Sequence, residues 1–199
     1  MALGHDGCCR WYHSPDYASR QPADRIGVRQ RVPAPRQLIA RAVVVTWLVT
    51  AAWDFLCASA LGVFAYGSTF SGFWQGVAST ALGPSALKMG ARGVAAGLGL
   101  HLAVALTWSA VCVLAIAKSS TLRGWLERPL GALAVATVYG PIIWLVMSFA
   151  VIPLATGRLP TLGLRWWVQV FAHVPFVTIP LVFTARRAFF NVDTGRHRT

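Results

Sequence analysis

Charged residues are scarce in this 199-residue sequence. Asp, Glu, Lys and Arg make up 12% of it, whereas a typical globular domain has about 25%. At the same time, 56% of the residues are hydrophobic and only six are acidic. There are too few charges to cover a water-facing surface, so the composition argues against a soluble protein.

Motifs of the common enzyme classes are also missing. The sequence has no Gly-rich phosphate loop, no HExxH, no GxSxG and no paired-carboxylate motif. Its four cysteines have neither CxxC nor metal-ligand spacing, which argues against a disulfide framework and a zinc site. We therefore expect a protein that is not an enzyme, with no catalytic residues, no bound metal and no cofactor.

What the sequence does have is four long apolar stretches, at about residues 42–66, 93–117, 130–155 and 166–185. A helix of about 20 apolar residues crosses a hydrocarbon core of about 30 Å. The stretches are continuous rather than alternating, which indicates helices and not a barrel. We expect an all-α integral membrane protein, with a four-helix bundle over residues 38–187.

Basic residues are distributed unevenly around these stretches. Fourteen of the 18 Lys and Arg lie before the first, between the second and third, or after the fourth. Basic loops resist translocation, so this bias predicts that both termini are cytoplasmic. The expected partners are the lipid bilayer and its anionic headgroups rather than nucleic acid. A homodimer or a membrane-protein partner is left open.

The two chain ends are polar and basic. Residues 1–37 lack the apolar stretch of a secretory signal and are rich in Pro and Arg. Such a segment cannot bury enough surface to become ordered, so we expect a disordered basic cytoplasmic tail with Cys8 and Cys9 as ordinary thiols. Residues 188–199 are expected to form a second basic cytoplasmic tail.

The segment between the first two stretches has a helical pattern. Its apolar residues recur at helical spacing, at Phe70, Phe73, Trp74, Val77 and Ala81. Gly83 and Pro84 follow and end the pattern. We expect a short helix over residues 70–82 that lies on the outer membrane surface.

Small residues recur at every fourth position in the first two stretches. The rows are Thr50, Asp54, Ala58 and Gly62 in the first, then Ala91, Ala95, Gly99 and Ala103, and Gly93, Gly97, His101 and Ala105, in the second. Small side chains allow helix backbones to approach closely in lipid. These rows are therefore predicted to be packing faces.

Two of these rows contain an ionisable residue: Asp54 in the first stretch and His101 in the second. A charge at the bilayer centre costs at least about 2.5–3.5 kcal/mol, so Asp54 marks a candidate site. His101 and His173 lie at matching depths, about two turns from the outer ends of their helices. We expect a buried polar centre of Asp54, His101 and His173, with the Tyr139 hydroxyl as a further partner. The alternative is that each group is satisfied separately.

Short motifs between Trp53 and Leu154 resemble those of a known family. They are Asp54, Gln75, Val77-Ala78-Ser79, Leu82-Gly83-Pro84, Leu98-Gly99-Leu100-His101-Leu102, Tyr139-Gly140, Met147 and Pro153-Leu154. The chain resembles the small bacterial inner-membrane proteins of the YagU-like type. This resemblance implies a multi-pass protein of the bacterial inner membrane without an established molecular activity.

Three functions compete at this point. The first is a non-enzymatic membrane protein in which the Asp/His centre stabilises the bundle. The second is a small proton-coupled transporter or channel-like protein that uses the same centre, because an Asp beside a His titrates near neutrality. The third is a b-type haem protein with His101 and His173 as axial ligands.

Overall fold

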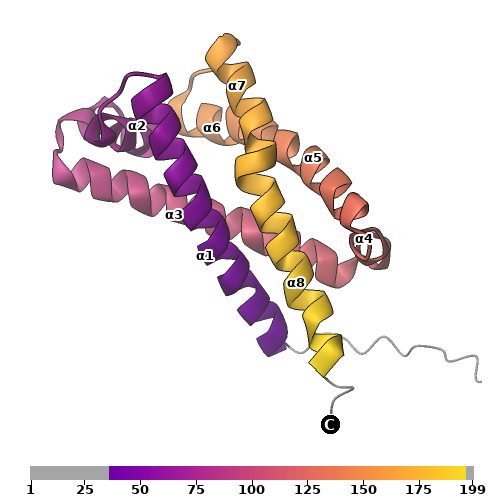
Figure 1. The fold of residues 1–199 in the computed structure, drawn as a ribbon. Helices are drawn as coiled ribbons and strands as arrows, with labels where there is room; N and C mark the ends of the chain where they lie inside the picture. Colours follow the sequence, from indigo (N-terminus) through magenta and orange to yellow (C-terminus); the bar gives the residue numbers. More distant parts are fainter. Residues whose placement is uncertain (1–35, 196–199) are drawn as a thin grey trace, which may run out of the picture. The chain divides into compact units, whose positions relative to one another are not determined.

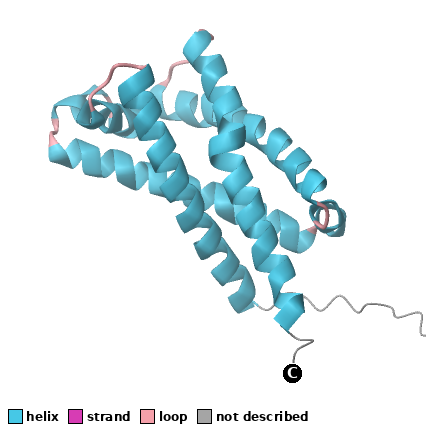
Figure 2. Cartoon of the chain, in the orientation of Figure 1, coloured by secondary structure: helices cyan, strands magenta, loops and turns pink. Residues whose placement is uncertain are grey.

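The computed structural model describes residues 36–195, with side chains described as far as Phe190. Every regular element in that part of the chain is a helix, and no strand occurs there (Figure 2). The all-α prediction is therefore confirmed for the described residues. Apart from residues 36 and 37, the predicted N-terminal tail with Cys8 and Cys9 lies outside them, as do residues 196–199.

Four of the helices are long and apolar enough to cross a membrane, as expected of a multi-pass membrane protein. They run over Arg36–Ala65, Ala91–Lys118, Pro129–Thr156 and Leu164–Phe190. Each corresponds to one of the four predicted stretches. The first begins before the predicted residue 42 and the fourth continues beyond 185, because arginines near a helix end reach polar surroundings without breaking the helix.

Each spanning helix consists of one or more consecutive elements. The first span is α1 (Arg36–Ala60) with the π-helical turn η2 (Leu61–Ala65), and the second is α3 (Ala91–Lys118) alone. The third span consists of α5 (Pro129–Val146), η4 (Met147–Val151) and α6 (Ile152–Thr156). The fourth span consists of α7 (Leu164–His173), η5 (Val174–Thr178) and α8 (Ile179–Gly195). The connections contain α2 (Phe70–Leu82), the 3₁₀ turn η3 (Pro84–Lys88) and α4 (Ser120–Leu126). Residues 188–195, predicted as part of a tail, thus continue α8.

The spanning helices alternate in direction. The start of α1 lies beside the end of α8 (Figure 1), and Arg186 of α8 donates hydrogen bonds to the backbone carbonyls of Leu126 and Glu127. We call this the terminal end. At the opposite end, the distal end, the Gln169 amide donates to the Tyr66 hydroxyl over 3.3 Å.

The predicted short helix over residues 70–82 forms as α2, with the predicted bounds. The Thr69 side chain caps its start by accepting a hydrogen bond from the backbone N–H of Gly72, and Gly83 ends it with φ of 75°. The helix packs against α3, where the backbone of Gly97 lies against that of Trp74. Trp74 is only 1% exposed, so α2 is anchored to α3.

One of the two predicted small-residue rows of α3 is a packing face. Gly93, Gly97 and Ala105 are buried, whereas the row of Ala91, Ala95, Gly99 and Ala103 is exposed. The row in α1 faces the interior, and Thr50 and Gly62 are buried in it.

A fourth row of small residues, in α5, was not predicted. Ala132, Ala136 and Gly140 are buried there. A Cβ atom on Gly140 would come within 3.0 Å of the Thr178 hydroxyl, and this hydroxyl donates to the Ala136 carbonyl over 2.7 Å. The row therefore brings the third and fourth spans into close contact.

An apolar core fills the terminal half of the spans. Its fully buried members come from α3, α4, α5 and α8 and include Val113, Ile116, Leu126, Leu181 and Val182. No charged side chain belongs to this core. Asp54, His101 and His173 lie on the distal side of it.

Candidate functional site

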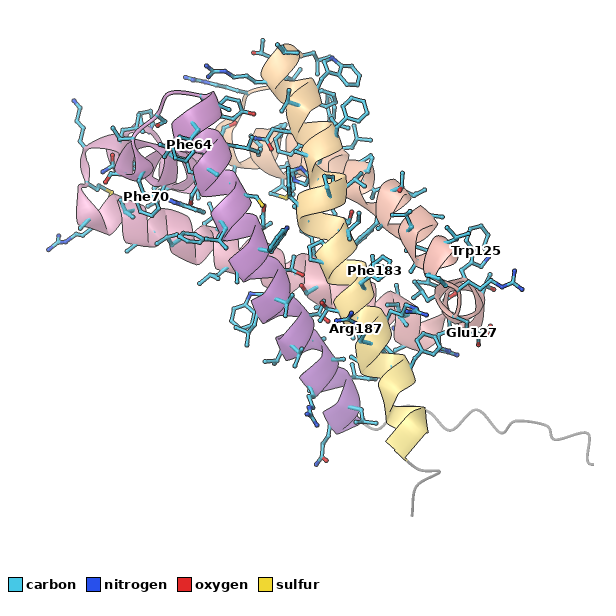
Figure 3. The ribbon with its side chains drawn as sticks, viewed as in Figure 1. Phe64, Phe70, Trp125, Glu127, Phe183 and Arg187 are labelled. Atoms are coloured by element: carbon cyan, nitrogen blue, oxygen red, sulfur yellow. The ribbon has the colours of Figure 1, made fainter. Side chains whose placement is uncertain are left out.

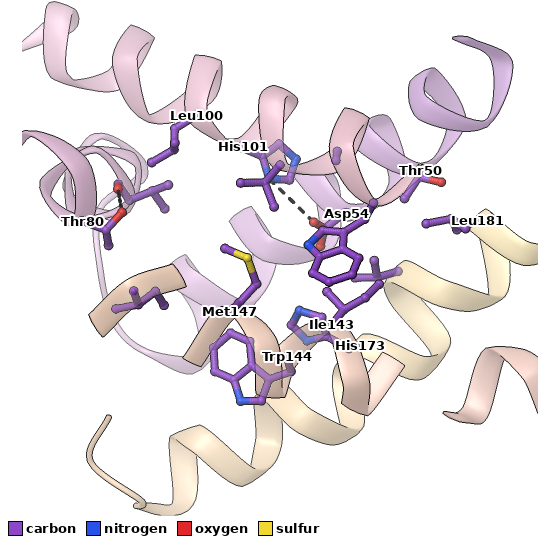
Figure 4. A pocket seen from close by; sticks show the side chains of 16 residues that line it. Thr50, Asp54, Thr80, Leu100, His101, Ile143, Trp144, Met147, His173 and Leu181 are labelled. Atoms are coloured by element: carbon purple, nitrogen blue, oxygen red, sulfur yellow. Dashed lines mark hydrogen bonds and ion pairs between the residues drawn. The ribbon is translucent and has the colours of Figure 1, made fainter. Parts of the chain in front are cut away.

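Asp54, His101 and His173 line one cavity of about 250 Å³ (Figure 4). The three side chains come from three different spanning helices, α1, α3 and α7. Asp54 and His173 also line a second, much smaller cavity of about 20 Å³, which places these two residues next to each other. The fold therefore brings together the three ionisable residues that the sequence analysis selected.

His101 faces an oxygen atom with each of its ring nitrogens. Nδ1 lies 3.7 Å from Oδ2 of Asp54, and Nε2 lies 3.4 Å from the backbone carbonyl oxygen of Ala51. A neutral imidazole has only one N–H. Favourable contact of both ring nitrogens with oxygen therefore requires one proton more than a neutral ring and an ionised carboxylate hold. Either His101 is an imidazolium beside a carboxylate, or a protonated Asp54 faces a neutral ring. Both arrangements leave the pair without net charge.

His173 is held by its own helix. Its Nδ1 lies 2.6 Å from the backbone carbonyl oxygen of Gln169, and a carbonyl only accepts hydrogen bonds, so Nδ1 carries the hydrogen. In the neutral ring, Nε2 then has a free lone pair. The π-helical turn η5 begins at the next residue and contains Pro175, whose missing N–H interrupts the regular α-helical bonding.

Asp54 has unused capacity to accept hydrogen bonds. Its side chain is 27% exposed, and within the described residues its one polar contact is with His101, at a distance longer than a hydrogen bond. An ionised carboxylate offers about four acceptor positions. In its ionised form, Asp54 therefore has room for a donor from a bound molecule.

The walls of the cavity are apolar and aromatic. Trp108 and Trp144 line it together with Ile143 and Met147, and the Trp144 ring lies against His173 at a centroid distance of 4.9 Å. None of these four residues was predicted to belong to the polar centre. Trp108 follows His101 by seven positions and so shares its helix face, but the place of Trp144 depends on how α5 packs.

Tyr139 does not line this cavity. Its hydroxyl donates a hydrogen bond to the backbone carbonyl of Trp108 over 2.9 Å, and the two rings are edge to face at 6.0 Å. The hydroxyl thus links α5 to α3. Tyr139 was predicted as a hydroxyl partner of the polar centre, but the direction of its side chain depends on how α5 packs against α3.

The cavity continues towards the distal end and not towards the terminal end. Thr80 and Ile152 line both the cavity and a neighbouring groove of about 630 Å³, which also contains Arg158. On the other side, Leu181 lines the cavity and belongs to the fully buried apolar core. Leu181 is therefore the floor of the cavity on the terminal side, and Thr80 and Ile152 lie between the cavity and the distal groove.

Comparisons with protein-family models, with curated proteins and with solved structures give no match. The resemblance to the YagU-like proteins therefore stays a prediction. Within residues 36–195, no three His, Cys, Asp or Glu side chains come together as a metal site would require. The function has to be argued from the cavity itself.

Proposed function

We propose that this chain is a non-enzymatic, multi-pass protein of the bacterial inner membrane that binds a small organic amine in the cavity at Asp54. In this proposal the four spans form a bundle of the YagU-like type with both termini cytoplasmic. The distal end then faces outward, and α2 lies near the outer membrane surface. The observation that carries the proposal is a carboxylate with unused acceptor positions inside a cavity walled by indole rings.

The polar groups of the cavity favour a donor-rich ligand. Asp54 offers carboxylate oxygens, and His173 offers the lone pair of Nε2. A primary ammonium group carries three N–H donors and no acceptor, so it matches both groups at once. Its positive charge is also attracted to the faces of indole rings such as those of Trp108 and Trp144.

The size and lining of the cavity favour a small ligand with an apolar body. A volume of about 250 Å³ is below the range of about 300–1,000 Å³ that holds drug-sized molecules. Ile143 and Met147 provide apolar contacts beside the indole rings. An amine with a single ring or a short alkyl chain fits this description.

The hypothesis that the centre only stabilises the bundle has less support. A structural clasp needs a short, well-formed contact, whereas His101 and Asp54 are 3.7 Å apart. A clasp also does not account for the adjoining cavity.

The haem hypothesis also has less support. An axial ligand gives its nitrogen lone pair to iron, and both ring nitrogens of His101 already face protein oxygens. The hypothesis has a direct spectroscopic test. Protein purified after expression with added haem is expected to lack a Soret band, and a band that disappears in the His101→Ala variant would revive it.

Proton-coupled transport is a second candidate, because an ammonium group and a proton compete for the same Asp54 carboxylate. In favour of it, the Asp54–His101 pair is neutral only when it holds an extra proton. A carrier would need another conformation in which the floor at Leu181 opens. Proteoliposomes loaded with radiolabelled amine test this candidate, since release driven by a pH gradient would distinguish transport from binding.

Binding itself is tested with two probes of the same shape. Phenethylamine and its neutral analogue 2-phenylethanol are added to the full-length protein in detergent, and binding is measured by calorimetry. We expect the amine to bind and the alcohol to bind at least about ten-fold more weakly, because a desolvated cation–π contact and a charge-assisted hydrogen bond together exceed 1.4 kcal/mol.

Two variants locate the binding. Asp54→Asn is expected to remove amine binding, while Glu127→Gln, the same chemical change at an exposed residue of the terminal end, leaves it unchanged. Equal binding of the amine and the alcohol, or undiminished amine binding by Asp54→Asn, would contradict the proposal.

A further inference from the structure

A further cavity, of different character, lies at the terminal end between α1 and α8. It is a groove of about 510 Å³ with apolar residues of both helices along its walls. Arg41 of α1 and Arg187 of α8 line it, and both side chains are exposed. Figure 3 labels Arg187 on the side of α8 that faces α1.

The arginines of this end divide into two kinds. Arg123 donates to the carbonyls of Ile116 and Ala117, and Arg186 donates to carbonyls at the end of α4; these two are used in the fold. Among the hydrogen bonds and ion pairs of residues 36–190, none involves the guanidinium of Arg41 or Arg187. Both are available to an outside anion.

No acidic side chain of the described residues lies in the groove. Only two acidic residues fall within 36–190, Asp54 and Glu127, and neither lines it. Figure 3 labels Glu127 beside α4, away from Arg187. With no acidic side chain of residues 36–190 in the groove, the two guanidinium groups form a positive rim that favours a phosphate, which arginine binds with paired hydrogen bonds.

The apolar part of the groove continues from this rim into the span. Val45 and Val49 follow Arg41 by four and eight residues, which corresponds to about 6 and 12 Å along the helix. Both valines are more than 40% exposed. A phosphate alone would leave this apolar wall uncovered, whereas a phospholipid has an acyl chain that covers it.

We propose that the groove between α1 and α8 binds one anionic phospholipid, with its phosphate between Arg41 and Arg187 and an acyl chain along Val45 and Val49. The positive charge of the rim favours this ligand over two other candidates, residues 1–35 and a second copy of the chain. Residues 1–35 of the same chain contain five Arg and three Asp, so they repel the rim on balance. A second copy of the chain packed through the same groove would place like charges against each other.

The test uses the full-length protein in a mild detergent, titrated with dioleoyl phosphatidylglycerol or dioleoyl phosphatidylcholine. Native mass spectrometry counts the bound lipids and gives the dissociation constants. One phosphatidylglycerol is expected to bind roughly 25-fold more tightly than phosphatidylcholine, since each arginine contributes about five-fold to the attraction of an anionic lipid. Equal affinity for the two lipids would overturn the proposal.

Charge variants distinguish a specific lipid site from a general electrostatic attraction between anionic lipids and the arginines. The double variant Arg41→Gln/Arg187→Gln is expected to lose the preference for phosphatidylglycerol. Arg36→Gln/Arg128→Gln removes the same charge from residues of the same end that do not line the groove, and it is expected to keep the preference. If both double variants weaken binding equally, the arginines act only as a diffuse charge and the site does not exist.

A shape variant tests the acyl chain without a change of charge. Val45→Trp fills the apolar wall of the groove and is expected to weaken phosphatidylglycerol binding at least about five-fold, which corresponds to about 1 kcal/mol. Unchanged binding, or displacement of the lipid by millimolar inorganic phosphate, would show that the rim binds a free anion and not a phospholipid.

Discussion

The backbone of Gly97 in α3 lies directly against the backbone carbonyl of Trp74 in α2, with no room for a side chain between them. This contact fixes α2 beside the cavity, because Trp74 also lies edge to face against His101 at 5.2 Å. The Gly97→Ala variant is expected to lose about 1–3 kcal/mol of stability, since a methyl group would force the two backbones apart. Thermal unfolding of the purified protein in detergent measures this loss.

Gly99 is the matched control, two residues further along the same helix. A Cβ atom added there meets nothing within 4 Å, and alanine favours the helix more than glycine does. Gly99→Ala is therefore expected to unfold at the same temperature as the wild type or above it. Equal losses in both variants would mean that α2 does not approach α3 at Gly97.

Replacement of Asp54 by Asn separates a ligand site from a structural clasp. In the variant, His101 takes its neutral form and donates from Nε2 to the Ala51 carbonyl, so no unpaired charge remains. We expect the free energy of unfolding to change by less than about 1 kcal/mol. A loss of about 3–5 kcal/mol, as for a broken buried ion pair, would favour the clasp.

The Thr178 hydroxyl contributes to the contact between the third and fourth spans. It is buried and donates to the Ala136 carbonyl, whereas the exposed Thr137 donates to the Leu133 carbonyl of its own helix. Thr178→Val is expected to lose about 1–2 kcal/mol, and Thr137→Val to stay within about 0.5 kcal/mol of the wild type. Chemical unfolding of both variants in one detergent compares them, and a similar effect in the two would refute this role.

Tyr139→Phe is expected to affect stability and not the cavity. The variant loses the hydrogen bond to the Trp108 carbonyl, which is worth about 1 kcal/mol, while the ring and its packing remain. Amine binding is expected to stay within two-fold of the wild type. A larger drop in affinity would mean that the hydroxyl belongs to the polar centre after all.

The spans could be predicted from the sequence because their signal is local. Continuous apolar runs and small residues at every fourth position were enough to give the helices and one face of α3. The pattern of α2 and its end at Gly83 were also predictable, because helix caps depend on neighbouring residues.

The cavity could not be predicted from the sequence in full, because it depends on how the helices pack against one another. Depth along a span predicted that Asp54 lies close to the two histidines, but no pattern in the sequence predicts that the Tyr139 hydroxyl points to Trp108. The row of Ala132, Ala136 and Gly140 became meaningful only beside Thr178. Side-chain direction depends on how helices rotate against one another, and a single sequence carries little signal for that.

Leu181 lies between the cavity and the terminal end of the bundle, because it lines the cavity and belongs to the buried apolar core. In the proposed function, an amine bound at Asp54 is therefore separated from the terminal end by this core. The occupancy of the site in this conformation then follows the amine concentration at the distal end.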